Sequence, residues 1–324
     1  MVSFYTKTSF IDAVSNCEVR WAGETDTLPK VSVVMPSYNH LPYIRAAIES
    51  VLSQSMRSLE LLIIDDASQD ASRALIEQAV DWDDRIRVEF HKSNLGIART
   101  LNEGLRSAEG EFVAFIASDD VWETSKLQKQ LSILEKDSNL LVWSEGRIIN
   151  ARGEVTGQTL TRMDKIQNKR KSGYIFDELL KGNLIFGSSL ILRRESAIEV
   201  MFDEGLKYLN DHKFVVELAR KHPYYFIEEP LAYYRLHGGN TAKRDIIGWL
   251  ADGVKFGEYL LQEYASEITR EEVGRLFAGV GTDYLFLGDR RKALYAIREA
   301  VRHNPLITPF HILWTTLGII THGK

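Results

Sequence analysis

An alternation of short apolar runs with segments of helical periodicity occupies residues 31–120, and it restricts the possible folds more than any other feature. Each run is short enough for a buried strand, and the segments between them repeat their apolar residues at helical spacing. The predicted order is strand 31–36, helix 41–56, strand 59–65, a helix capped by Asp70, strand 87–91, helix 96–107 and strand 112–117. Strands and helices in this order predict an α/β fold around a mostly parallel sheet.

Polar residues follow every predicted strand of this region. In open parallel sheets, ligands bind in the crevice beyond the carboxyl ends of the strands. The residues at those ends are Ser37-Tyr38-Asn39, Asp65-Asp66, Asn94 with Gly96, and Asp119-Asp120. We therefore expect a ligand site along this edge of the sheet.

Asp119 and Asp120 are adjacent acids at the end of the run FVAFIA. Two neighbouring carboxylates repel each other unless a cation or hydrogen-bond donors absorb the charge, so the pair suggests a divalent metal. The structural alternative is a pair that caps the helix beginning near Glu123, but capping explains only one of the two acids.

The pattern becomes mixed after Asp120. We expect a helix at 124–136, strands at 140–146, 190–194 and 224–235, a helix around 211–221, and helices from residue 243 onward. The basic stretch 162–171 is interpreted as a solvated loop, with a mobile flap as the alternative. This divides the chain into an N-terminal segment 1–30, a main domain 31–242 and a helical extension 243–324.

Composition excludes several classes of protein and of site. A formal net charge of −5 without a basic domain argues against a nucleic-acid partner. Cys17 is the only cysteine, which excludes an internal disulfide and cysteine-built metal sites. The N-terminus MVSFYTKTSF has no long apolar stretch typical of a secretion signal. These features predict a cytoplasmic protein.

The first predicted strand ends in Pro36-Ser37-Tyr38-Asn39, without glycine or lysine. A dinucleotide fold needs Gly-x-Gly-x-x-Gly at this place, and a P-loop needs a glycine-rich turn with a lysine. Dehydrogenase and P-loop interpretations are therefore disfavoured. A nucleotidyltransferase is disfavoured for the same reason.

Several segments in order resemble one enzyme family. They are VSVVMPSYNH, LLIIDDASQD, NLGIARTLNEGL, GEFVAFIASDDVW and YLNDHKF. Together they resemble family-two glycosyltransferases of the GT-A fold, of the type that builds bacterial cell-surface polysaccharides, over roughly residues 30–240. The resemblance implies a GT-A-like nucleotide-binding β/α/β sandwich. It also implies metal-dependent, inverting transfer of a sugar from a UDP- or dTDP-type donor to a hydroxyl of a glycan or lipid-linked saccharide.

The resemblance assigns the nucleotide to Pro36, Tyr38 and Asp66. A carboxylate accepts a hydrogen bond from N3–H of uracil or thymine, and a tyrosine ring offers a stacking face. One of the acids Asp65 and Asp66 is expected to cap a turn instead, and we favour Asp66 as the ligand.

Asn94-Leu95-Gly96 resembles the family's Asn-x-Gly turn beside the nucleotide. Gly96 serves the geometry of that turn. Arg99 is expected either to face the diphosphate or to lie exposed on its helix.

The family's acidic motif is Asp-x-Asp, with one carboxylate on the ribose and another on Mg²⁺ or Mn²⁺. Ala117 stands in place of the first acid. We expect Asp119 to serve the ribose or share the metal, and Asp120 to bind the metal, because a hard cation needs carboxylate oxygen.

The family takes its catalytic base from a Glu-Asp pair, which here is Asn210-Asp211. Asp211 is the predicted base, and the alternative is an N-terminal helix acid favoured by the dipole. Tyr-Arg-Leu-His resembles a family segment near the diphosphate, which implies that Arg235 offers positive charge and His237 a metal ligand or phosphate donor; the alternative is a strand-end arginine and a loop histidine without function. Glu145 and Ser188 are expected in the sugar-acceptor cleft.

The main alternative function is an inactive nucleotide-sugar binding module of the same fold, supported by Ala117 and Asn210. The C-terminal helices are expected to pack on the main domain, to self-associate, or to hold the protein at the inner face of the cell membrane. The apolar segment 305–320 is interpreted as a packed terminal helix or as a membrane-surface contact.

Overall fold

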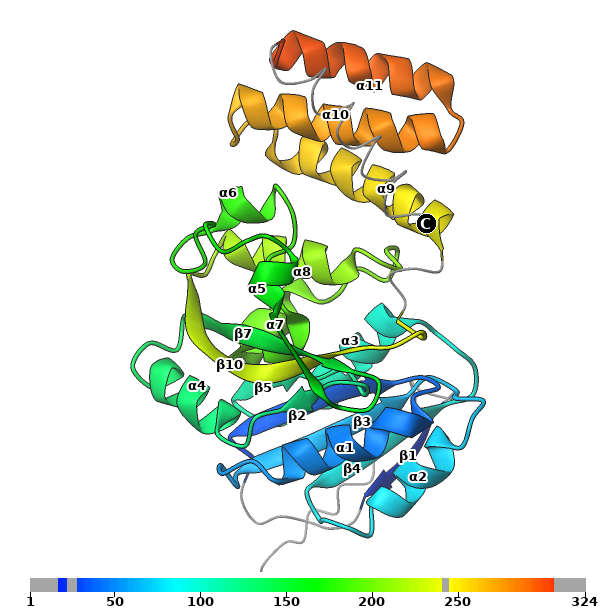
Figure 1. The fold of residues 1–324 in the computed structure, drawn as a ribbon, viewed down its shortest axis with the longest axis vertical. Coiled ribbons are helices and arrows are strands. Elements are labelled where there is room, and N and C mark those ends of the chain that lie inside the picture. The colour runs from blue at the N-terminus through cyan, green and yellow to red at the C-terminus, as the bar shows by residue number, and fades with distance from the viewer. Residues whose placement is uncertain (1–16, 22–27, 241–244, 306–324) are drawn as a thin grey trace, which may run out of the picture.

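The computed structural model describes residues 17–21, 28–240 and 245–305. A ten-stranded sheet crosses the molecule in the order β1-β4-β3-β2-β5-β9-β7-β10-β6, and β8 pairs with β7 (Figure 1). The strands are β1 (Cys17–Trp21), β2 (Val31–Ser37), β3 (Leu59–Asp65), β4 (Ile86–His91), β5 (Phe112–Phe115), β6 (Val121–Trp122), β7 (Leu141–Asn150), β8 (Val155–Thr159), β9 (Ile191–Arg193) and β10 (Tyr224–Leu236).

The first half of the sheet is parallel, as the alternating pattern predicted. β2 pairs in parallel with β3 and β5, and β3 pairs in parallel with β4. The second half is mixed: β7 and β10 are parallel, whereas β9 runs antiparallel to β5 and β7. β1 adds an antiparallel edge to β4, so part of the predicted N-terminal segment belongs to the sheet.

Helices cover both faces of the sheet. One face is packed by α1 (Leu41–Leu52), α2 (Ser72–Ala79) and α4 (Lys126–Leu134), through apolar stripes such as Ile44, Ile48 and Val51. The other face is packed by α3 (Ile97–Ser107), α7 (Arg194–Val200) and α8 (Asn210–Ala219). The two apolar layers are the cores that fix the strand ends in place.

Element boundaries differ from prediction mainly where polar residues follow an apolar stripe. The helix predicted at 41–56 ends at Leu52, and the strand predicted at 140–146 continues to Asn150. Stretch 162–171 is a loop except for the end of α5 (Leu160–Met163). α6 (Phe176–Leu179) and the 3₁₀ turn η1 (Gly187–Ser189) are too short for periodicity to reveal.

The helical extension comprises α9 (Ile246–Tyr264), α10 (Arg270–Phe286) and α11 (Arg290–His303), stacked at one end of the molecule (Figure 1). α9 belongs to the core of the main body through Phe256, Leu260 and Tyr264. Among the described residues, no helix is both long and apolar enough to cross a membrane. Most of the predicted terminal segment 305–320 lies outside the described residues.

Candidate active site

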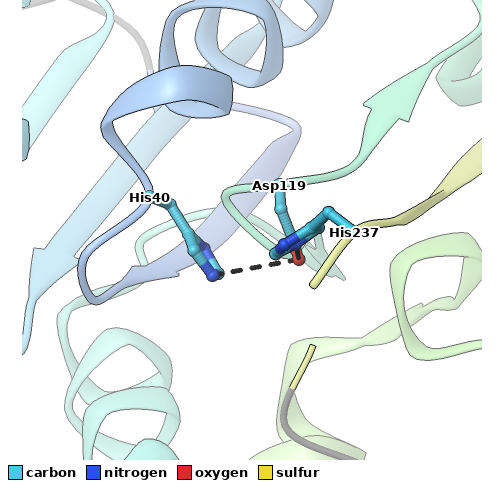
Figure 2. A group of neighbouring side chains, drawn as sticks. All are labelled: His40, Asp119 and His237. Carbon is cyan, nitrogen blue, oxygen red and sulfur yellow. Dashed lines mark hydrogen bonds and ion pairs between the residues drawn. The ribbon is translucent and has the colours of Figure 1, made fainter. Parts of the chain in front are cut away.

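Three strand-end segments bring His40, Asp119 and His237 together (Figure 2). His237 Nε2 lies 2.9 Å from Asp119 Oδ2, and His40 Nε2 lies 3.9 Å from the same oxygen. One ligand atom from each residue falls within 4.8 Å of the others, and this is the group in the described chain that could hold a metal ion. The cluster joins the loop after β2, the loop after β5 and the end of β10.

Neighbouring groups orient both imidazoles. His40 Nδ1 lies 2.8 Å from Ser118 Oγ, which leaves Nε2 toward Asp119. Burial lowers the pKa of His40, partly offset by the charge of Asp119, so the ring is neutral near pH 7. His237 Nδ1 accepts the Gly239 N–H at 3.0 Å, and its Nε2 faces Asp119. The Tyr43 ring packs at 4.5 Å from the His237 ring.

The donor types of this cluster suit a divalent metal, and binding through His237 Nε2 would require the proton to leave that atom, because Nδ1 accepts the Gly239 N–H. Neutral imidazole nitrogen and carboxylate oxygen are common ligands of divalent first-row ions. Mg²⁺ prefers oxygen ligands in near-octahedral geometry, whereas imidazole nitrogen suits first-row transition ions, so two histidines with one aspartate favour a transition ion such as Mn²⁺ over Mg²⁺. An ion held by these three residues would take its remaining ligands from water and substrate oxygens.

Asp120 is turned away from this cluster. It is 1% exposed, and its carboxylate accepts hydrogen bonds from Ser188 Oγ at 2.6 Å and from the Arg235 backbone N–H at 3.0 Å. Burial raises the pKa of Asp120 well above its usual value, and the charge of Asp119 adds to this rise. Asp120 therefore ties the β5 loop to η1 and β10, and the carboxylate in the cluster that could hold a metal ion is that of Asp119.

Arg235 supplies buried positive charge beside the two acids. Its Nε donates to the Asp119 carbonyl at 2.7 Å, and its Nη1 donates to the Asn150 carbonyl at 3.3 Å. The guanidinium also lies 5.1 Å from the centre of the Tyr43 ring. Arg235 thus holds the backbone that presents Asp119, in addition to contributing charge.

On the predicted nucleotide side, Asp66 accepts hydrogen bonds from three donors. They are Leu95 N–H at 2.7 Å, Gly96 N–H at 2.9 Å and His91 Nδ1 at 2.8 Å. Burial acts to raise the pKa of Asp66, but these hydrogen bonds outweigh it and hold the pKa below its usual value. His91 also contacts Glu103 of α3 at 2.5 Å, so a buried imidazole at the end of β4 links the loop after β3 to α3.

The other residues predicted for the nucleotide side differ in their exposure and in their contacts. Asp65 caps its own turn by accepting from Ser68 N–H and Oγ, as expected for one of the two acids. Asn94 Nδ2 donates to the Asp66 carbonyl at 3.2 Å. Pro36 is buried in β2, and the Tyr38 side chain is 42% exposed. The backbone of Gly96 has a φ of 89°. Arg99 is exposed and forms an ion pair with Glu103.

Asp211 occupies the first turn of α8. Its side chain reaches solvent, yet the protein around it desolvates the carboxylate and raises its pKa to about 6. Hydrogen bonds from His212 N–H at 2.7 Å and Asn183 Nδ2 at 3.1 Å partly offset this rise. Asn210 is buried and donates to the Leu206 and Lys207 carbonyls, so it holds backbone beside Asp211.

The two residues predicted in the acceptor cleft have structural partners. Glu145 is buried and accepts from Gly146 N–H, from Thr161 N–H and from the Thr161 hydroxyl, which fixes the start of α5. Ser188 donates to Asp120 and accepts the Ala117 N–H at 3.1 Å.

Sequence reasoning missed His40, Tyr43 and His91. His40 directly follows the Ser-Tyr-Asn turn at a strand end, so its position was a usable signal. Tyr43 and His91 lie within a predicted helix and strand, where an aromatic residue or histidine gives no cue of its own. Their roles depend on partners far away in the sequence.

Comparison with known proteins identifies the family. A family model described as glycosyl transferase family 2 matches residues 32–202. The chain belongs to glycosyltransferase family 2. It is therefore a glycosyltransferase with the GT-A fold, as its motifs predicted.

Curated relatives are similar over most of this glycosyltransferase. TuaG of Bacillus subtilis (strain 168), named as a glycosyltransferase of teichuronic acid biosynthesis, is 32% identical over 65% of this chain and 81% of its own. An uncharacterized glycosyltransferase of Rickettsia typhi is 27% identical over 81% of this chain and 78% of its own. A relative in Rickettsia bellii is 28% identical over 80% of this chain, but the match spans 36% of that protein.

Solved structures share the fold. TarS residues 1–349 of S. aureus, in complex with UDP-GlcNAc, superposes with a TM-score of 0.62 at 17% identity, covering 85% of this chain and 81% of that one. The mannosyltransferase PcManGT of Pyrobaculum calidifontis, in complex with GDP-Man and Mn²⁺, superposes with a TM-score of 0.52 at 16% identity, covering 91% and 81%.

Proposed function

We propose that this glycosyltransferase is Mn²⁺-dependent and inverting, and that it moves a sugar from a nucleotide diphosphate to a hydroxyl of a saccharide or lipid-linked saccharide. The observation that carries the proposal is the cluster of His40, Asp119 and His237 at the strand ends. It lies at the same edge of the sheet as the loop that carries Asp66. A metal site beside a nucleotide site suits a leaving group that is a nucleotide diphosphate.

The metal would be held by Asp119, His237 and His40. When bound, it supplies positive charge that stabilises the departing diphosphate. Arg235, buried next to Asp119, adds a permanent charge and keeps the Asp119 backbone in place. In this proposal Asp120 holds the loop rather than the ion, which differs from the assignment expected from the sequence.

Asp211 would accept the proton of the acceptor hydroxyl. A pKa of about 6 leaves it mostly ionised at neutral pH, while it remains more basic than an ordinary aspartate. Attack by the deprotonated hydroxyl on the anomeric carbon breaks the bond to the diphosphate oxygen in one displacement, and the proton stays on Asp211. A single displacement inverts the configuration at that carbon.

The donor would carry a pyrimidine base. Tyr38 offers an exposed ring for stacking, and Asp66 offers a carboxylate oxygen to the N3–H of uracil or thymine. The Asp66 side chain is held ionised by its three donors, so it acts as an acceptor at neutral pH. These features support a UDP- or dTDP-sugar.

The acceptor would be presented at a membrane surface, with α11 as the contact. Leu294 and Tyr295 are 69% and 64% exposed, and Val301 is also exposed. Arg291 and Arg298 are exposed on the same helix, so apolar and cationic side chains share its outer side. A helix of this kind binds anionic lipid surfaces through apolar burial and charge.

The membrane proposal is tested by vesicle sedimentation. The wild-type protein should sediment with phosphatidylglycerol vesicles and not with phosphatidylcholine vesicles, and Arg291→Glu with Arg298→Glu should abolish sedimentation. Light scattering on the free protein separates self-association from lipid binding. Equal sedimentation with both lipids, or none with either, would rule out an anionic contact through α11.

The transfer reaction is tested by a screen of nucleotide sugars with Mn²⁺. A cognate donor should raise the melting temperature, and donor turnover should release nucleotide diphosphate at a rate that Asp119→Asn abolishes. Binding without any release, under every metal and donor combination, would instead favour an inactive binding module. Release that is unchanged by chelation would contradict the role of the metal.

A further inference from the structure

The first helix of the extension reaches the helix that carries Asp211. Asp252 of α9 is 4% exposed, and its carboxylate accepts the Tyr208 N–H at 2.6 Å and the Leu209 N–H at 3.4 Å. Leu209 is the N-terminal capping residue of α8 and has no capping side chain of its own. The acceptor for this turn therefore comes from a residue more than forty positions later in the chain.

Further contacts hold the same turn. Tyr208 stacks on Trp249 with ring centres 5.3 Å apart, and its hydroxyl donates to Asp245 at 2.7 Å. The His212 ring packs at 4.9 Å from the Phe256 ring. Asp211 thus has neighbours on both sides, at Tyr208 and His212, that are fixed by α9.

We propose that Asp252 is a positioning residue for Asp211, and that the helical extension is therefore a working part of the transferase site. The inference rests on the proposed role of Asp211 as the base. A charged carboxylate that receives backbone N–H groups makes strong hydrogen bonds, and the buried N–H groups would otherwise lack an acceptor. Loss of Asp252 releases the turn that sets the direction of the Asp211 side chain.

α9 also contacts α8 at its other end, which provides a matched control. The Tyr259 hydroxyl donates to Glu217 at 2.8 Å, near the C-terminus of α8, and Tyr264 donates to the same carboxylate at 2.6 Å. Tyr259→Phe removes one contact between the same two helices but leaves the turn at Tyr208 intact. If α9 only supports the packing of α8, variants at either end of the contact between the two helices should lower turnover by similar amounts.

The test uses the full chain, UDP with Mn²⁺ for binding, and the UDP- or dTDP-sugar with the fastest wild-type nucleotide release for turnover. Asp252→Ala should lower turnover roughly 10- to 100-fold, because small displacements of a reacting group cost about that much. UDP affinity and donor KM should stay within about threefold, since the nucleotide loops are untouched. Tyr259→Phe should keep wild-type turnover.

Conservative replacement distinguishes positioning from loss of fold. Asp252→Asn keeps one acceptor oxygen, so it should recover turnover to within about fivefold of wild type, because a neutral acceptor is about half as strong as a charged one. If Asp252→Ala does not fold, Asp252→Ser provides the same test with a polar side chain too short to reach both N–H groups.

The outcomes separate this inference from the proposed function. A wild-type protein that releases no nucleotide from any donor would contradict the transferase proposal and, with it, the inference. An active wild type with unchanged turnover in Asp252→Ala would overturn the inference alone. Equal losses in Asp252→Ala and Tyr259→Phe would also overturn it, because both would then reflect general packing of α9.

Discussion

The proposed nucleotide side, around Asp66, and the proposed metal side, around Asp119, are assembled in different ways. On the nucleotide side, the linking hydrogen bonds join neighbouring β/α units: Asn39 to Gln69 and Asp66 to Gly96 each span 30 residues. On the metal side, Asp119 bonds to His237 across 118 residues. The first side forms with the parallel half of the sheet, whereas the second exists only once β10 has paired beside β7. We expect variants of the metal side, and of Asp211, to impair turnover more than they weaken nucleotide binding.

The sharpest separation is expected from Asp211→Asn. Loss of a general base typically costs about 10²- to 10⁴-fold in rate, and UDP affinity should not change because Asp211 is outside the nucleotide loops. In the wild type, turnover should fall as pH drops through about 6, where Asp211 becomes protonated and can no longer accept a proton. Steady-state kinetics against pH test both effects. A variant with normal turnover, or a wild-type rate that is flat from pH 5 to 7, would remove Asp211 from the mechanism.

The next largest effect is expected from Asp119→Asn. Removing the one carboxylate of the cluster should weaken Mn²⁺ binding by about 100-fold or more, judged from the 10- to 100-fold typical of groups that only support a ligand. Calorimetric titration with Mn²⁺ measures this directly. Asp120→Asn is the matched control and should retain Mn²⁺ affinity to within about tenfold, since its carboxylate is used by Ser188 and Arg235. The reverse ranking would restore Asp120 as the ligand.

Removal of one hydrogen-bond donor should lower the free energy of unfolding by different amounts on the two sides. Ser188→Ala removes a donor from the buried Asp120 carboxylate, which should lower the free energy of unfolding by about 2–3 kcal/mol. Ser68→Ala removes a donor from Asp65 in a local turn and should cost about 1 kcal/mol. Urea unfolding curves of both variants test the difference. Equal decreases in the free energy of unfolding would show that the long-range contact of Ser188 and the local contact of Ser68 contribute alike.

A smaller, pH-dependent effect is expected from His91→Gln. Burial acts to lower the pKa of His91, but the hydrogen bonds that its ring donates to Asp66 and Glu103 raise that pKa above its usual value of 6.5. The charged imidazole therefore adds stability below pH 6.5, and this contribution disappears as the pH rises through the raised value. The difference in unfolding free energy between wild type and variant should be about 1 kcal/mol at pH 6 and should shrink toward pH 9. A difference in unfolding free energy that grows with pH would contradict the predicted direction of the pH dependence.

The sequence predicts the strand ends of the proposed nucleotide side better than the contacts of the proposed metal side, because the first depend on local periodicity and the second on distant partners. Hydrophobic periodicity locates β2, β3, β4 and β5, and their polar ends follow directly. It does not reveal which of two adjacent acids turns inward. Asp120 is buried by Ser188 and by the Arg235 backbone, which arrive from later strands, so only the fold distinguishes it from Asp119.

The same limit applies to His40 and Asp252. His40 becomes a candidate ligand because β10 brings His237 beside it, with ring centres 5.8 Å apart. Asp252 lies within a helix whose sequence indicates only an amphipathic element. Neither role is visible in local spacing, because each depends on a partner that the chain reaches only after folding.

Pulsed EPR of the Mn²⁺-loaded protein tests the metal cluster most directly. Two histidine ligands should produce nitrogen hyperfine couplings to Mn²⁺, because imidazole nitrogen is bonded to the ion. His40→Gln and His237→Gln should each remove part of that coupling, and the double variant should remove all of it. A Mn²⁺ spectrum without nitrogen coupling in the wild type would show an all-oxygen site and contradict the cluster of His40, Asp119 and His237.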